Sequence, residues 1–398
     1  MSYGNNFELT APTLRGTPVV RTLRRAALLL LAIGALGAVV TALSAPHRLA
    51  ANYLVGVAFL LNIAATATFF SALLFLVHAG WSASVRRLGE FVAGLLPWVL
   101  LGLLPIIVAP GSFYHWTHEL HTDALIAQKS WYLDPWFFRA RLVLYALLWL
   151  GMYRFVIGNS LRQDEAEDYA PTLRNVRSAG VWVLIYALSF TFAAVDLLMT
   201  LEAHWYSTIF GVYIFAGSFV ATLGVITLLA VVLREQGYLR DFITVERYHD
   251  LGKLVFAFSV FWAYIAFSQY MLIWYGNLPE ETVYFLKRMG RAEWQWIGIV
   301  LPIVRFALPF ALLLRRDAKR NPAILLTAST IVVLGHYLDL AWIVLPAFGR
   351  DGLGWQEVAI FAGFVGIGAG MLSFQLERAP AVAVRDPYLQ ESLETTSG

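Results

Sequence analysis

The chain is divided into apolar blocks of about 20 residues or more, and this length limits the possible folds more than any other feature of the sequence. A helix that rises 1.5 Å per residue needs about 20 residues to cross a bilayer core roughly 30 Å thick. Hydrophobic residues make up 59% of the 398 positions and charged residues 14%, whereas about a quarter of the residues in a soluble domain are charged. The sequence therefore predicts an all-α integral membrane protein.

The number of blocks gives the expected topology. They predict about ten transmembrane helices, at residues 24–44, 51–79, 91–109, 136–158, 178–199, 206–233, 253–274, 294–315, 323–346 and 356–376. We expect a single ten-helix transmembrane domain over 24–377, an N-terminal segment over 1–23 and a C-terminal tail over 378–398. Because the tail is polar and contains two prolines, we expect it to be extended and to dock on another subunit.

The positions of Lys and Arg predict which side of the membrane each loop faces, because short basic loops stay in the cytoplasm. With the N-terminus inside, the cytoplasmic segments contain most of the basic residues. The opposite loops contain only Arg48, Lys129, Lys287, Arg288, Arg291 and Arg350. Both termini are therefore expected to be cytoplasmic.

The composition also limits the cofactors that the chain can hold. Cysteine is absent, which excludes a cysteine-ligated iron–sulfur cluster and a C-x-x-C-H haem attachment on this chain. Only His336 lies well inside a span, so a b-type haem is not expected. The outside histidines His115, His118 and His121 match no defined ligand spacing, and we expect no metal site there. The basic residues form no patch that would bind nucleic acid.

Ionisable side chains inside the spans are few, and each costs on the order of 3 kcal/mol near the bilayer centre, so each needs a partner, a cavity or a function. The clearest are Asp196, Arg305, His336 and Asp339, with Gln269 as an uncharged polar neighbour. Positions three, four, seven and ten residues apart share a helix face. This spacing predicts three polar stripes: Tyr186, Ser189, Ala193 and Asp196; Ser259, Trp262, Ala266 and Gln269; and Ser329, His336 and Asp339.

The predicted orientation places Asp196, Gln269 and Asp339 in the outer halves of their helices, near Glu202 and His204. We expect these side chains to converge on one buried site. Carboxylates and histidine in such a site can relay protons to the outside water, because burial and their mutual influence tune their pKa values toward neutrality. The sequence identifies no catalytic residue.

Arg305 permits a second interpretation, in which it pairs with Asp196 or Asp339 only to hold the helices together, as buried charges usually pair. Pro302 and Pro309 flank this arginine, and each removes a backbone hydrogen-bond donor from the helix. The sequence therefore predicts a kink at Arg305, and a kink can open a ligand cavity.

Several motifs resemble those of a known family. The string VDLLMTLEAHWYSTIFGVYIFAGSF, residues 195–219, is similar to a signature of the NrfD-like membrane subunits of alternative complex III. Further matches, to the smaller of the two such subunits, are HDLGKLVFAFSVFWAYIAFSQYMLIWYGNLPEET (249–282), RRDAKRNP (315–322), DLAWIVLPAF (339–348) and RDPYLQESL (385–393). The similarity covers most of the C-terminal two thirds and extends back to about residue 115.

The resemblance implies a ten-helix NrfD-like bundle in the bacterial cytoplasmic membrane, as a subunit without its own redox centre in a quinol:cytochrome c oxidoreductase. The implied partners are an iron–sulfur or molybdopterin-like subunit, multihaem c-type cytochrome subunits and a larger NrfD-like paralogue. Quinone or quinol is the implied ligand, bound either by this chain or by the paralogue, with no covalently bound cofactor. The resemblance implies that the positions matching the motif conduct protons or shape a quinone cavity; they are Asp196, Glu202, His204, Trp205 and Ser207.

Two other functions are compatible with ten helices and buried carboxylates. The first is a proton-coupled secondary transporter, although such folds usually contain inverted repeats, which we do not find in the sequence. The second is a purely structural membrane anchor that docks soluble redox subunits.

Overall fold

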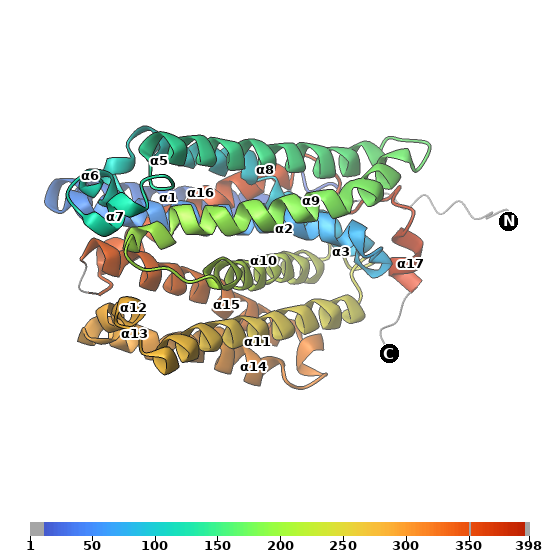
Figure 1. Cartoon of the computed structure of the whole chain (residues 1–398). Coiled ribbons are helices and arrows are strands. Elements are labelled where there is room, and N and C mark those ends of the chain that lie inside the picture. Colours follow the sequence, from blue (N-terminus) through green and yellow to red (C-terminus); the bar gives the residue numbers. More distant parts are fainter. Residues whose placement is uncertain (1–11, 350–351, 395–398) are drawn as a thin grey trace.

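The computed structural model describes residues 12–349 and 352–394, and within these ranges the chain forms helices and no strand (Figure 1). Ten helical segments of the described chain are long and apolar enough to cross a membrane. The chain is therefore a multi-pass membrane protein with an all-α fold, as expected. Residues 1–11 of the expected N-terminal segment, Arg350, and residues 395–398 of the tail lie outside the described residues.

The ten spans follow one another along the chain, and the two longest connections, residues 109–134 and 277–291, contain short helices of their own. They are α1 (Pro18–Ser44), α2 (Pro46–Leu76), a broken span of η1 (Gly80–Ser82), α3 (Ala83–Ala93), α4 (Leu96–Val99), η2 (Leu100–Leu103) and α5 (Leu104–Val108), α8 (Pro135–Gln163), α9 (Ala170–Leu197) with η4 (Met199–Glu202), α10 (Phe210–Glu235), α11 (Val245–Gly276), α13 (Ala292–Pro302) with η5 (Ile303–Ala307) and α14 (Leu308–Leu313), α15 (Pro322–Val344) with η7 (Leu345–Phe348), and α16 (Trp355–Gln375). The connections contain η3 (Pro110–Ser112), α6 (Trp116–Glu119), α7 (Ala124–Gln128), α12 (Pro279–Met289) and η6 (Ala318–Arg320), and the tail contains α17 (Leu389–Glu394).

Proline and short polar side chains start several of these helices. Pro135 and Pro322 occupy first-turn positions, where proline removes no helical hydrogen bond. Asp134 precedes α8 and accepts a hydrogen bond from the Phe137 N–H at 2.8 Å. Asn321 does the same for α15, with the Ala323 N–H at 2.9 Å. These local signals explain why the chain enters both helices at these points.

The third span differs from its expected bounds. We expected residues 91–109 to be helical, but the span begins at Gly80, and Arg87 lies buried within α3 rather than in a loop. Its charge is matched there, because its guanidinium lies 3.1 Å from Glu90 and 2.7 Å from Asp164. Pairing of this kind permits arginine inside an apolar helix bundle, and a hydropathy pattern does not reveal the partner.

Helix α2 is buried along most of its length and joins two groups of helices. One group consists of α3, α8 and α9, and the other of α10, α11, α13, α14 and α15. Figure 1 shows α8 on one side of α2 and α10, α15 and α11 on the other, with α12 at one end of the bundle and α17 at the opposite end. We name these the α12 end and the α17 end.

The expectation of an extended tail that docks on another subunit is wrong for the described residues of the tail. These residues fold back onto the α17 end, where α17 packs against η1 and α3. The Ser392 hydroxyl donates to the Trp81 carbonyl at 2.6 Å, and Asp386 forms an ion pair with the buried Arg86. These contacts hold the tail on its own chain because they satisfy groups that would otherwise be buried without partners.

Helices α1 and α16 pack tightly against each other at the edge of the bundle. Glycine makes this approach possible: a Cβ atom at Gly363 would lie 2.8 Å from the Cα atom of Gly34. Gly370, on the same helix, is different, because a Cβ atom there would lie at an ordinary 3.9 Å from the Ala27 side chain. Close packing through small residues is a common source of helix association in membranes.

The two glycines give a matched test of this interface. Gly363→Ala is expected to destabilise the protein by about 2 kcal/mol through overpacking against backbone, whereas Gly370→Ala should be neutral or slightly stabilising, because alanine favours helix. Thermal unfolding of both purified variants in detergent measures the difference. Equal midpoints for the two variants would contradict the tight α1–α16 contact.

Candidate functional site

Asp339 is the buried acid around which the candidate site is built. It lies on α15, is 3% exposed and accepts hydrogen bonds from the Tyr213 hydroxyl and from Trp262 Nε1, the latter at 3.2 Å. Arg305 Nε lies 3.7 Å from its carboxylate. The donors come from α10 and α11 and the cation from η5, so four elements meet at this one carboxylate.

Arg305 is brought to this position by an interruption of its helix, as the flanking prolines predicted. After Pro302 the chain forms one π-helical turn, Ile303–Ala307, before the α-helix resumes. Turns of this type often occur at functional sites. The guanidinium also lies over the Trp262 ring, 4.6 Å from its centroid, and a Cβ atom at Gly217 would come within 2.7 Å of it. Glycine at position 217 therefore leaves room for the cation.

His336 lies one turn before Asp339 on the same face of α15 and is 1% exposed. No described protein group forms a hydrogen bond with either of its ring nitrogens or with the guanidinium nitrogens of Arg305. Buried polar groups in proteins are usually satisfied, by protein or by internal water. Arg305, His336 and Asp339 thus form a cluster of buried polar groups in the apolar interior around α15.

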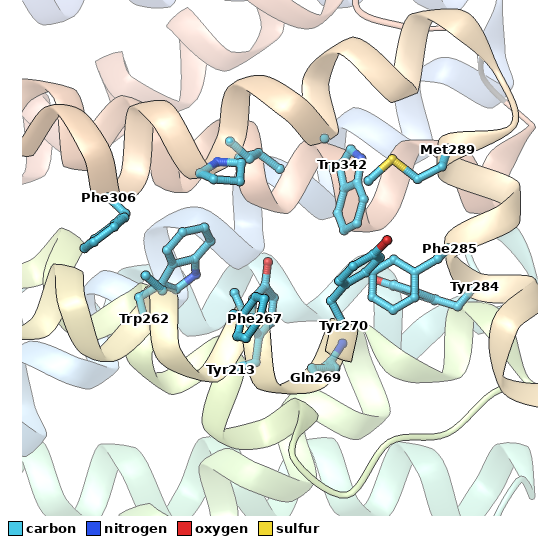
Figure 2. Close-up of a pocket in the computed structure, with 15 residues that line it drawn as sticks. Tyr213, Trp262, Phe267, Gln269, Tyr270, Tyr284, Phe285, Met289, Phe306 and Trp342 are labelled. Atoms are coloured by element: carbon cyan, nitrogen blue, oxygen red, sulfur yellow. The ribbon is translucent and has the colours of Figure 1, made fainter. Parts of the chain in front are cut away.

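A cavity of about 470 Å³ lies beside this cluster. Figure 2 shows its walls, which are mostly aromatic and come from α10, α11, α12, α13, η5 and α15. The lining residues are Tyr213, Trp262, Ala263, Ala266, Phe267, Gln269, Tyr270, Tyr284, Phe285, Met289, Gly298, Leu301, Pro302, Phe306 and Trp342. Phe267 and Tyr270 are also exposed on the outer surface of the bundle, so the cavity borders the lipid-facing side of α11.

Two side chains contact both the cavity and the Asp339 carboxylate. Tyr213 and Trp262 line the cavity, and both also donate hydrogen bonds to Asp339. Gln269, 5% exposed, adds a side-chain oxygen for which the described residues offer no donor. A ligand in this cavity would therefore meet apolar rings on most sides and a small number of polar groups near Asp339, which is the usual composition of a small-molecule site.

Helix α12 closes the cavity at its end of the bundle. Tyr284 of α12 stacks on Trp205 with the ring centroids 4.0 Å apart, and Arg288 donates to the carbonyls of Trp342 and Ile343 at 3.0 and 2.7 Å. Burial raises the pKa of Tyr284 to about 12, despite the nearby Arg288 cation, so its hydroxyl stays protonated at neutral pH.

Glu202 fixes α12 to the rest of the bundle. Its carboxylate lies 3.0 Å from Lys287 and 3.5 Å from Arg288. Glu202 itself follows α9 in η4. Glu202 therefore contacts α12, which lines the cavity, but does not itself line the cavity.

Asp196 belongs to a different site. Its two carboxylate oxygens accept hydrogen bonds from Nε and Nη2 of Arg141, both at 2.8 Å, and a third comes from the Tyr145 hydroxyl at 2.8 Å. The carboxylate is fully paired, and this arrangement joins α9 to α8. Bidentate pairing of this kind is strong and geometrically specific.

His204 lies in yet another place, on the surface at the α12 end. Its Nε2 atom is 2.8 Å from Asp123, and the two side chains are 50% and 30% exposed, respectively. The backbone N–H of Ile126 lowers the pKa of Asp123, and the His204 contact lowers it further.

The expected single site is thus wrong in its grouping. Asp339, Arg305 and His336 form one cluster, and Gln269 lines the cavity next to it, whereas Asp196, Glu202 and His204 each have separate partners. The three predicted polar stripes are nevertheless turned inward: Asp196, Gln269 and Asp339 are all buried.

Sequence reasoning missed four residues that hold these acids in place: Arg141, Tyr145, Tyr213 and Trp262. Arg141 is an ionisable residue within a predicted span and could have been included on that ground. Trp262 lies on a predicted polar stripe, but its spacing alone indicates no hydrogen bond to Asp339. The two tyrosines gave no separate signal, because tyrosine is common near membrane surfaces.

Comparison with known proteins adds no family assignment: no protein-family model matches the chain, and no curated protein is significantly similar to it.

The pair of Arg141 and Asp196 allows a test of how much these two buried charges stabilise the fold together. Arg141→Met leaves a buried carboxylate without its cation and should cost about 3 to 5 kcal/mol. The double change Arg141→Met with Asp196→Asn removes both charges and should recover much of that loss. Unfolding measurements on the two single variants and the double variant give the coupling energy. Additive losses would mean that the two side chains do not stabilise each other.

Proposed function

We propose that this chain is a membrane subunit of a respiratory quinol:cytochrome c oxidoreductase of the alternative complex III type, with an NrfD-like bundle. In this proposal it binds quinol in the cavity between α11, α12 and α13, and Asp339 serves the proton pathway. One observation carries it: Tyr213 and Trp262 line the cavity and also donate hydrogen bonds to the buried Asp339.

The chemistry of quinol agrees with this geometry. A quinol has a flat ring that stacks on aromatic side chains and an apolar tail that dissolves in lipid, so its site should be aromatic and should border the bilayer. Oxidation releases protons from the two hydroxyl groups, and a positioned carboxylate is a suitable acceptor. Gln269 and Tyr213 would orient the head group, while Arg305 would compensate the charge of Asp339.

Sidedness and partners are part of the same proposal. The distribution of Lys and Arg favours a cytoplasmic α17 end in a bacterial cytoplasmic membrane. The α12 end, with Glu202 and His204, would then face the outer side. There it would contact the iron–sulfur or molybdopterin-like subunit and the multihaem cytochromes, and a larger NrfD-like paralogue would lie beside it in the membrane.

A substitution that fills the cavity tests the binding site. Ala266 lines the cavity, whereas Ala257 lies on the exposed surface of the same helix, α11. Ala266→Phe should reduce labelling by a photoreactive ubiquinone or menaquinone analogue about tenfold, because the added ring occupies the ligand's space. Ala257→Phe should leave labelling unchanged. Equal labelling of both variants, or labelled peptides outside the elements that line the cavity (α10 to α13, η5 and α15), would place the quinone elsewhere.

A second substitution tests the proton step. Asp339→Asn keeps the size of the side chain but removes its ability to accept a proton. In the intact complex it should lower quinol oxidation about a hundredfold, the usual contribution of a general base, while quinone labelling persists. Normal quinol oxidation and proton release in this variant would instead favour a purely structural anchor.

A further inference from the structure

Four arginines form an exposed basic patch on the hairpin of α8 and α9, near the α17 end of the bundle. They are Arg154 and Arg162 on α8 and Arg174 and Arg177 on α9. Figure 1 shows these helices as neighbours along one edge of the bundle, with their connection at the same end as α17. We propose that this patch binds the phosphate head group of an anionic phospholipid. The proposal is independent of any quinone chemistry.

Helical spacing places the arginines on the lipid-facing sides of their helices. Arg154 and Arg162 continue the exposed stripe of α8 that contains Leu144 and Leu147, at steps of three, seven and eight residues, which keep side chains on one helix face. The opposite face of α8 carries Ser160, which donates to the buried Glu90 at 2.6 Å. The basic side chains therefore point away from the protein interior.

The same pattern holds on α9. Arg174 and Arg177 precede Val181, Leu184 and Leu188, which are all exposed and apolar. On both helices, then, the arginines end an apolar stripe that contacts lipid tails. This is the depth at which phospholipid head groups lie, and basic residues there attract anionic lipids.

The two helices are in register at this level. Asn159 donates to the Asn175 side chain at 3.1 Å, and Asn175 donates to the Val156 carbonyl at 2.9 Å. Arg162 and Arg174 lie one turn or less beyond this contact toward the loop, and Arg177 lies less than one turn to its other side. Arg162, Arg174 and Arg177 therefore flank the same short stretch of the hairpin, and Arg154 lies about two helical turns before Arg162 on the same face of α8.

Between the arginines of α8 there is open space. Gly158 lies one turn from each of Arg154 and Arg162, and a Cβ atom on it would meet no atom within 4 Å. Two arginines separated by a residue without a side chain leave room for a compact group such as a phosphate, which guanidinium groups bind with paired hydrogen bonds.

No carboxylate described in the structure forms an ion pair with any of the four arginines, so no neighbouring acid neutralises the positive charge of the patch. Arg162 donates only one long hydrogen bond, to Asn159 Oδ1 at 3.4 Å. Two acids of the adjacent loop are engaged elsewhere: Asp164 pairs with Arg87 at 2.7 Å, and Asp168 accepts the Ala170 N–H at 3.2 Å. The remaining loop acids, Glu165 and Glu167, are exposed to water.

The test compares two pairs of arginines at the same end of the bundle. The purified full-length chain is equilibrated with mixed micelles of phosphatidylglycerol and phosphatidylcholine, and native mass spectrometry counts the lipids that each protein retains. Arg174→Gln with Arg177→Gln should weaken phosphatidylglycerol retention about thirtyfold, since each basic residue near a membrane surface contributes roughly a factor of five. Phosphatidylcholine retention should not change.

The matched control is Arg21→Gln with Arg25→Gln, two exposed arginines on α1. This variant loses the same charge and should retain phosphatidylglycerol normally. Equal losses in both variants would show only general attraction to basic residues and would overturn the proposal. Inorganic phosphate added alone should not displace the lipid; displacement that depends on Arg174 and Arg177 would identify a site for soluble phosphate instead. Unchanged unfolding midpoints without lipid confirm that both variants are folded.

Discussion

The ion pair between Arg305 and Asp339 is the interaction on which the centre of this structure depends. An unpaired carboxylate or guanidinium is costly in an apolar bundle, so each of these residues is tolerable there only because the other is near. The surrounding chain is shaped to permit this. The π-turn at Ile303–Ala307 presents the arginine, and glycines at positions 217 and 335 leave space for its side chain.

A second buried pair, Arg141 with Asp196, shows why the first is the better functional candidate. Asp196 accepts two hydrogen bonds from Arg141 and one from Tyr145, so its carboxylate is occupied by protein donors. Asp339 is joined instead through Tyr213 and Trp262 to a cavity, and Arg305 has no hydrogen-bond acceptor among the described protein groups. The same pair of residue types thus stabilises the fold in one place and, in the proposed function, serves chemistry in the other.

The fold was largely predictable because its main determinant is the length of apolar segments, which a sequence shows directly. The interruption at Arg305 was also predictable from the sequence, because Pro302 cannot donate a backbone hydrogen bond. Burial of the polar stripes followed from helical spacing. The pairing of charges did not, because contacts such as Arg141 with Asp196 or Arg86 with Asp386 join residues far apart in the chain. The docking of the tail on its own bundle was not predicted, because prolines and polar residues are typical of an extended segment. The ion pair of Asp386 with Arg86 of α3, which holds the tail in place, joins residues far apart in the sequence.

Infrared difference spectroscopy on the isotopically labelled complex tests the central assignment most directly, because it observes the Asp339 carboxyl group while quinone in the cavity is reduced and reoxidised. The account predicts a change in a carboxyl C=O band that coincides with quinone turnover and disappears when position 339 is asparagine. A spectrum without a carboxyl band, or with a band that persists in the asparagine variant, would contradict a role for Asp339 in proton transfer.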